Sequence, residues 1–199
     1  MMLRVARIVP STRAEGPGLR SAVWVAGCSI RCHGCFNPHL FDPAGGNLMS
    51  PEQVAERMLS LPEIEGISVL GGEPFDQAVP LSRLARLAHQ SDKSVMVYTG
   101  YRYEHLLAGR VDGADQLLQE VDILIDGPFI ASRIDRQRPW LGSTNQRVLR
   151  LTGEIAEGEG SVDRLEIRIA SDGRLEVNGW ATPDQIAELR ALIEDESEP

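Results

Sequence analysis

Short apolar segments alternate with amphipathic ones through most of this chain, and this alternation limits the possible folds more than any other feature. Residues 3–9, 21–26, 67–70, 94–98 and 122–125 have the apolar, often β-branched composition of strands. Helical periodicity appears at residues 51–61, 81–89, 103–107 and 116–121. Strands joined by crossover helices form parallel sheets. We therefore expect an α/β fold with mostly parallel strands and functional loops at their carboxyl ends.

The pattern changes after residue 148. Residues 165–177 predict a hairpin with Ser171-Asp172-Gly173 at its tip. Thr182-Pro183-Asp184-Gln185 then predicts a helix start, with the capping-box pattern also seen at Ser50-Pro51-Glu52-Gln53. We expect residues 1–150 to form the core of the protein and residues 151–199 a small appendage of hairpin and helix.

Composition excludes several classes of protein. The 199 residues carry a net charge of −9, which argues against broad binding to the phosphate backbone of nucleic acid. No apolar run approaches the ~18 residues of a membrane span. Residues 1–8 include two arginines and lack the apolar core of a signal peptide. We expect a cytoplasmic protein that binds neither nucleic acid nor membrane.

All three cysteines fall within eight residues, as Cys28, Cys32 and Cys35. A structural zinc site and a fully protein-ligated [4Fe-4S] cluster each need four ligands. The C-x3-C-x2-C spacing can instead hold three irons of a [4Fe-4S] cluster and leave the fourth iron open for chemistry. A small chelating molecule with an amine and a carboxylate would suit that iron, and S-adenosylmethionine (SAM) has both groups.

Other uses of the cysteines stay open. His33 could complete a zinc site, although it directly follows Cys32 and adjacent residues rarely close one tetrahedron. A disulfide with one free thiol would suit a secreted protein, and three unliganded thiols are also possible. Cysteines of cytosolic proteins more often bind metal or act in catalysis.

The cysteine spacing resembles the signature of radical SAM enzymes, and further segments extend the likeness. Glu15-Gly16-Pro17-Gly18-Leu19-Arg20 and Cys35-Phe36-Asn37-Pro38 resemble the glycyl-radical-enzyme activases. Gly71-Gly72-Glu73-Pro74 is similar to the second motif of the superfamily, which contacts the methionyl amine of SAM. Tyr98-Thr99-Gly100-Tyr101 and residues 121–129 and 141–147 resemble the activating proteins of anaerobic ribonucleotide reductases.

This resemblance covers about residues 10–150 and implies a partial (β/α) barrel of the radical SAM type. Cys28, Cys32 and Cys35 would be the iron ligands and the catalytic centre. The candidate cofactor-binding residues follow the family motifs and the strand ends: Gly34, Phe36, Asn37, Gly71, Gly72, Glu73, Pro74, Thr99, Asp126 and Arg147. Gly34 stands where many radical SAM proteins have an aromatic residue near the adenine, and Phe36 lies on the other side of the third cysteine.

Each assignment has a plainer alternative. Gly71 and Gly72 would let a ligand approach the backbone closely, with Glu73 accepting hydrogen bonds from an ammonium group, but glycine also marks ordinary turns. Thr99 and Asp126 could meet the ribose or the charge of the cofactor, or simply cap a strand and form a turn.

Three more positions near these motifs have two interpretations each. Asn37 could orient the cysteine loop or be a turn residue. Tyr98 could pack in the core or face the adenine, and packing is the plainer role for Trp140.

Residues 131–150 hold five arginines and one acid, Asp135, so this segment is basic within an acidic chain. It could bind the cofactor carboxylate, an anionic substrate or a partner surface, or it could be a solvated loop. Arg147 is the best candidate because it lies in the Asn145-Gln146-Arg147 segment that resembles the family.

The expected function is reductive cleavage of SAM at the open [4Fe-4S] cluster to a deoxyadenosyl radical. That radical would take a hydrogen atom from a glycine Cα of a partner protein. A one-electron donor such as a flavodoxin or ferredoxin would reduce the cluster. Two alternatives remain: a radical SAM enzyme that modifies a small molecule or another peptide residue, and a non-enzymatic iron–sulfur carrier.

Overall fold

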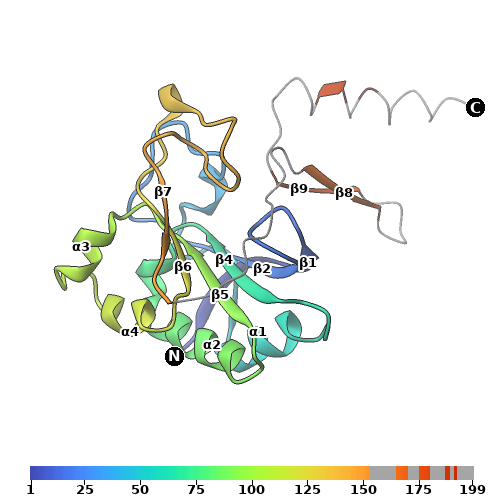
Figure 1. Ribbon diagram of the computed structural model, residues 1–199, viewed down its shortest axis with the longest axis vertical. Coiled ribbons are helices and arrows are strands. Elements are labelled where there is room, and N and C mark those ends of the chain that lie inside the picture. The colour runs from blue at the N-terminus through green and yellow to red at the C-terminus, as the bar shows by residue number, and fades with distance from the viewer. Residues whose placement is uncertain (153–164, 170–174, 180–186, 189–190, 192–199) are drawn as a thin grey trace, which may run out of the picture.

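A seven-stranded sheet with the strand order β3-β1-β2-β4-β5-β6-β7 forms the centre of the protein (Figure 1). The computed structural model describes residues 1–152, 165–169, 175–179, 187–188 and 191. The strands of the sheet are β1 (Leu3–Thr12), β2 (Arg20–Val25), β3 (Asn47–Met49), β4 (Gly66–Gly71), β5 (Ser94–Tyr98), β6 (Ile123–Asp126) and β7 (Arg147–Arg150).

The four inner strands β2, β4, β5 and β6 are parallel, as the sequence predicted. The outer strands differ, because β1 and β3 pair antiparallel with their neighbours and so does β7 with β6. Only residues 13–19 connect β1 to β2, which is too short for the crossover that a parallel pair requires. β3 and β7 are the two edges of the sheet, so the described residues form an open sheet and not a closed barrel.

Four α-helices lie close to their predicted places: α1 (Pro51–Met58), α2 (Ala78–His89), α3 (Tyr103–Leu107) and α4 (Ala114–Leu118). The predicted capping box of α1 is confirmed: Gln53 N–H donates to Ser50 Oγ at 3.2 Å, and Ser50 N–H donates to Gln53 Oε1 at 2.9 Å. Three 3-10 helices were not predicted: η1 (Pro38–Leu40), η2 (Pro74–Gln77) and η3 (Ala131–Arg133).

The two faces of the sheet have different coverings. On one face, the strands pack against α1, α2, α3 and α4 in the main hydrophobic core, with Val54, Leu84 and Leu117 facing Val69 and Val97. Figure 1 shows helices α1, α2 and α4 on one side of the sheet and the long loops on the other. The second face carries smaller apolar clusters, and the candidate site lies there.

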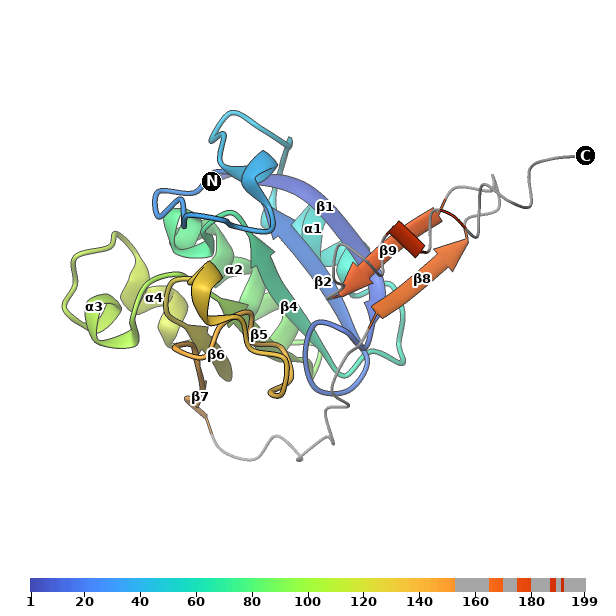
Figure 2. The same ribbon diagram turned by 90° about the horizontal axis from the view of Figure 1, so that it is seen from above.

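Strands β8 (Leu165–Ile169) and β9 (Leu175–Gly179) form a separate antiparallel pair beside the loop between β1 and β2 (Figure 2). Glu166 accepts hydrogen bonds from the Thr12 hydroxyl and from Arg13 N–H, each at 2.6 Å. Asn178 Nδ2 donates to Thr12 Oγ1 at 2.8 Å. These contacts anchor the pair to the central sheet.

The predicted tip of this hairpin and most of the predicted helix after Thr182 lie outside the described residues. Of the helices within the described part of the chain, none combines the length and the apolar character needed to span a membrane.

Candidate functional site

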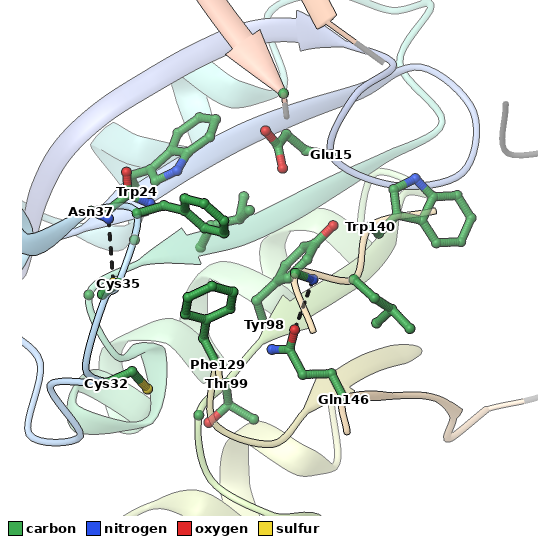
Figure 3. A pocket seen from close by; sticks show the side chains of 18 of the residues that line it. Glu15, Trp24, Cys32, Cys35, Asn37, Tyr98, Thr99, Phe129, Trp140 and Gln146 are labelled. Atoms are coloured by element: carbon green, nitrogen blue, oxygen red, sulfur yellow. Dashed lines mark hydrogen bonds between the residues drawn. The ribbon is translucent and has the colours of Figure 1, made fainter. Parts of the chain in front are cut away.

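A cavity of about 480 Å³ lies at the carboxyl ends of the parallel strands, on the face of the sheet opposite the core formed with α1, α2, α3 and α4 (Figure 3). Nine of the predicted site residues line it: Cys28, Cys32, Cys35, Phe36, Asn37, Gly71, Gly72, Glu73 and Thr99. Gly34, Pro74, Asp126 and Arg147 are not part of the lining. Most of the predicted site residues therefore meet at the carboxyl ends of the parallel strands, where the functional loops were expected.

The three cysteines lie on the loop that follows β2, and backbone groups of this loop already point at their sulfurs. Arg31 N–H donates to Cys28 Sγ and Asn37 N–H donates to Cys35 Sγ, each at 3.4 Å. Burial raises the pKa of the Cys28 and Cys32 thiols, and backbone hydrogen bonds from Arg31 and Phe129 oppose this. Such N–H donors stabilise the thiolate form that binds iron.

The arrangement of the cysteines suits a cluster better than a single ion. Within the described residues, no three His, Cys, Asp or Glu side chains converge closely enough to hold one metal ion. A cubane cluster instead presents its irons at separate corners, so its ligands surround a volume. Cys28, Cys32 and Cys35 all line the same cavity, and the described residues add no fourth cysteine. These residues fit a [4Fe-4S] cluster with one open iron.

Gly71 and Gly72 are needed because the chain itself approaches them closely. Gly71 has a φ of +118°, and a Cβ there would lie 2.3 Å from the backbone nitrogen of Val25. A Cβ on Gly72 would lie 1.9 Å from the carbonyl oxygen of Gly27. Room for a ligand beside these glycines, the expected role, stays a prediction. They also allow the end of β4 to pack against the start of the cysteine loop.

Glu73 is 1% exposed, and its carboxylate joins the ends of two strands. Oε1 accepts hydrogen bonds from Phe75 N–H at 2.9 Å and from the Thr99 hydroxyl at 2.7 Å, and Oε2 accepts from Gly100 N–H at 2.9 Å. Burial raises the pKa of Glu73 to about 7. The carboxylate therefore holds the loops after β4 and β5 together.

A network next to Cys28 was not predicted. Ser29 N–H and the Ser29 hydroxyl donate to the two carboxylate oxygens of Asp76, each at 2.7 Å. The Ser29 and Tyr101 hydroxyls are 2.9 Å apart. These residues come from three separate loops, so sequence spacing gives no signal for the contact. The network holds the first half of the cysteine loop in place.

Gly34 and Pro74 support the site from outside the cavity. Gly34 has a φ of +74°, and a Cβ there would lie 2.8 Å from the Cβ of Ala131. The cysteine loop can pack against η3 because this position is glycine. Pro74 is buried at the start of η2, directly after Glu73.

Asp126 and Arg147 pair with each other. Asp126 is 1% exposed, accepts a hydrogen bond from Tyr103 N–H at 2.8 Å, and forms an ion pair with Arg147. The Arg147 guanidinium also forms two hydrogen bonds with Glu104, at 2.9 and 3.0 Å. These two acids raise the pKa of Arg147 above its ordinary value. A contact of either residue with the cofactor stays a prediction, and the geometry supports a structural role.

The arginine-rich segment is also partly occupied by internal contacts. Arg138 Nε donates to Asp135 at 2.6 Å, and its other nitrogens donate to the carbonyl oxygens of Thr144 and Gln146. Arg138 and Arg147 thus stabilise the fold of residues 131–150, and the segment is not a simple solvated loop.

Aromatic side chains from distant parts of the chain complete the cavity. The rings of Phe36 and Phe129 lie 4.6 Å apart beside the cysteines. Tyr98 and Trp140 line the other end together with Glu15 (Figure 3), and Trp24 also lines the cavity. Trp24, Phe129 and Glu15 were not predicted as cavity residues. Phe129 follows the end of β6, so the strand-end rule could have indicated it.

Comparisons with known proteins agree with this site. A family model described as a 4Fe-4S single cluster domain matches residues 14–149. The anaerobic ribonucleoside-triphosphate reductase-activating protein of Vibrio cholerae is 32% identical over 152 residues, which cover 72% of this chain and 95% of that protein. The chain belongs to this family. The protein of the same name from Pasteurella multocida is 31% identical, with 72% and 94% covered, and that of enterobacteria phage T4 is 30% identical, with 71% and 90% covered.

Membership of the activating-protein family confirms the predicted cofactors, a [4Fe-4S] cluster and SAM, and the predicted class of enzyme, a radical SAM activase. The family match ends at residue 149. Strands β8 and β9 therefore lie beyond the matched region, although Val177, Asn178 and Gly179 line the same cavity as the cysteines.

Proposed function

We propose that this protein generates a glycyl radical on an anaerobic ribonucleoside-triphosphate reductase. The observation that carries the proposal is the single cavity in which Cys28, Cys32 and Cys35 face the ends of the parallel strands. When bound, the cluster and SAM supply the one-electron cleavage of the sulfonium C–S bond. The products would be a glycyl radical on the partner, methionine and 5′-deoxyadenosine, with the glycine Cα hydrogen atom retained in the last.

The residues of this chain bind and orient the reacting groups. Each cysteine would hold one iron, and the N–H groups of Arg31 and Asn37 stabilise the sulfurs. Gly71, Gly72 and Thr99 line the same cavity as the cysteines and would be suited to the polar end of SAM. Phe36 and Phe129 form an apolar wall on one side of the cavity.

The remaining structural features fit this function. We place residues 1–150 in a radical SAM core, whose four parallel strands would be part of a (β/α) barrel, and residues 151–199 in an appendage.

A one-electron donor such as a flavodoxin or ferredoxin would reduce the cluster. Thiolate ligands need a reducing compartment, so we propose a cytoplasmic protein.

The test begins with anaerobic reconstitution with iron and sulfide, followed by dithionite and SAM. We expect 5′-deoxyadenosine from the wild-type protein and none from Cys32→Ala. Addition of the reductase should then give the doublet of a glycyl radical in electron paramagnetic resonance spectra. SAM cleavage without any radical on the reductase would favour another substrate. A loaded cluster that neither binds nor cleaves SAM would favour an electron carrier.

A further inference from the structure

We propose that Tyr98, together with the β8–β9 hairpin, forms a subsite for the main chain of the glycine-bearing segment of the partner protein. This inference rests on the proposed function and extends it to the end of the cavity opposite the cysteines. It gives a role in substrate recognition to a hairpin that lies beyond the family match, which ends at residue 149.

The Tyr98 hydroxyl is the first observation. Its oxygen is buried, and within the described part of the chain it has no hydrogen-bond partner. Buried hydroxyls nearly always have a partner, so an orphan on a residue that lines the cavity points to a ligand that supplies one. Figure 3 shows the Tyr98 ring directed away from Cys32, with its hydroxyl toward Glu15 and Trp140.

The hairpin is the second observation. Val177, Asn178 and Gly179 of β9 line the cavity together with Glu15. Asn178 is only 4% exposed and donates to Thr12. Glu166 fixes the other strand through Thr12 and Arg13. The hairpin is thus an anchored wall of this end of the cavity.

The chemistry of glycine decides which ligand fits. A glycine has no side chain, so the main-chain amides around it are the polar groups that it offers for recognition. A phenol hydroxyl can donate to a carbonyl oxygen of such a segment, and a carboxylate can accept from an N–H group. The aromatic ring of Trp140 is a flat apolar surface against which a segment without side-chain bulk can pack. A peptide main chain therefore matches this subsite.

Tyr98→Phe is the decisive variant, because it removes one hydroxyl that has no protein partner. Its free energy of unfolding should equal or exceed that of the wild type. The probe is a short synthetic peptide copied from the glycine-bearing segment of the reductase. We expect its affinity to fall about fivefold, the effect of one hydrogen bond. SAM affinity and 5′-deoxyadenosine formation without the peptide should be unchanged. Tyr103→Phe, outside the cavity lining, is the matched control.

Glu166→Ala tests the hairpin, since it removes the acceptor of both hydrogen bonds to the β1–β2 loop. Peptide affinity should again fall while SAM affinity stays constant. Lower SAM affinity in Tyr98→Phe with unchanged peptide affinity would assign the hydroxyl to the cofactor and overturn the inference. Unchanged affinities in both variants would also overturn it. A wild-type protein that cleaves SAM but neither binds the peptide nor gives a glycyl radical would instead overturn the proposed function.

Discussion

The Glu73 carboxylate accepts a hydrogen bond of 2.7 Å from the Thr99 hydroxyl and so ties the end of β4 to the end of β5. Both side chains are buried beneath the cavity. The position of the backbone around Gly71, Gly72 and Gly100 depends on this contact, because Gly100 N–H donates to the same carboxylate.

Glu73→Gln should destabilise the protein and weaken SAM binding. The glutamine carboxamide keeps one acceptor oxygen, but an NH2 group replaces the other. That NH2 group cannot accept the hydrogen bond that an N–H or O–H group donates to Glu73. An unsatisfied buried group costs about 1–3 kcal/mol. Chemical denaturation would measure the loss, with Glu52→Gln on the exposed face of α1 as the control. Equal stability of the two variants would contradict the role of Glu73 as a tie between strands.

Cys32→Ala should lose most of the iron and sulfide after reconstitution, because the chain has no cysteine outside this loop to replace it. His33→Ala should keep the full cluster and its absorbance. The His33 side chain distinguishes the cluster from the zinc alternative, in which it would be the fourth ligand. Metal analysis of both variants decides the matter: equal loss of metal in both, with zinc present in the wild type, would favour zinc.

Arg147→Met should lower stability without changing SAM affinity. The substitution leaves the buried Asp126 carboxylate without its cation and breaks the contact with Glu104. Because the arginine is partly exposed, we expect a loss of about 1–2 kcal/mol, below that of a fully buried pair. Thermal unfolding and SAM titration would measure the two effects. A large fall in SAM affinity with no change in stability would show instead that Arg147 contacts the cofactor.

Stability should decrease as the pH rises from about 5 to about 8. Burial raises the pKa of Glu15 and of Glu73 from 4.5 to about 7. The folded state therefore binds more protons than the unfolded state in this window. The resulting stabilisation is complete below the pKa that these groups have in the unfolded state. It is lost as the pH rises through the pKa that they have in the folded state. We expect an effect of about 1–3 kcal/mol for each group.

Glu15→Gln tests this pH dependence, because it removes one of the two groups. The free energy of unfolding, measured by denaturant titration across the same pH range, should vary less in the variant than in the wild type. An equal slope in both proteins would show that Glu15 titrates near its ordinary pKa.

Features that depend on residues close together in the chain were predicted correctly, whereas features that depend on contacts between distant residues were not. The capping box of α1 was correct because Ser50 and Gln53 are three positions apart, and the strands β4, β5 and β6 were correct because local composition identifies them. The short strands β3 and β7 were missed because their pairing, and not their composition, makes them strands. Arg147 was assigned to the cofactor from its motif, but its partners Glu104 and Asp126 lie in other elements.

The sequence by itself determined the cysteine spacing, the order of the inner strands and the four α-helices between them, and the edge of the sheet where the site lies. These properties depend on neighbouring residues and on the handedness of the chain. Only the tertiary structure decided that Glu73 binds Thr99, that Gly72 faces Gly27, and that the hairpin at Asn178 closes a cavity shared with the cysteines. Such contacts join residues far apart in the chain, and strand register and loop packing fix them to within a few tenths of an ångström.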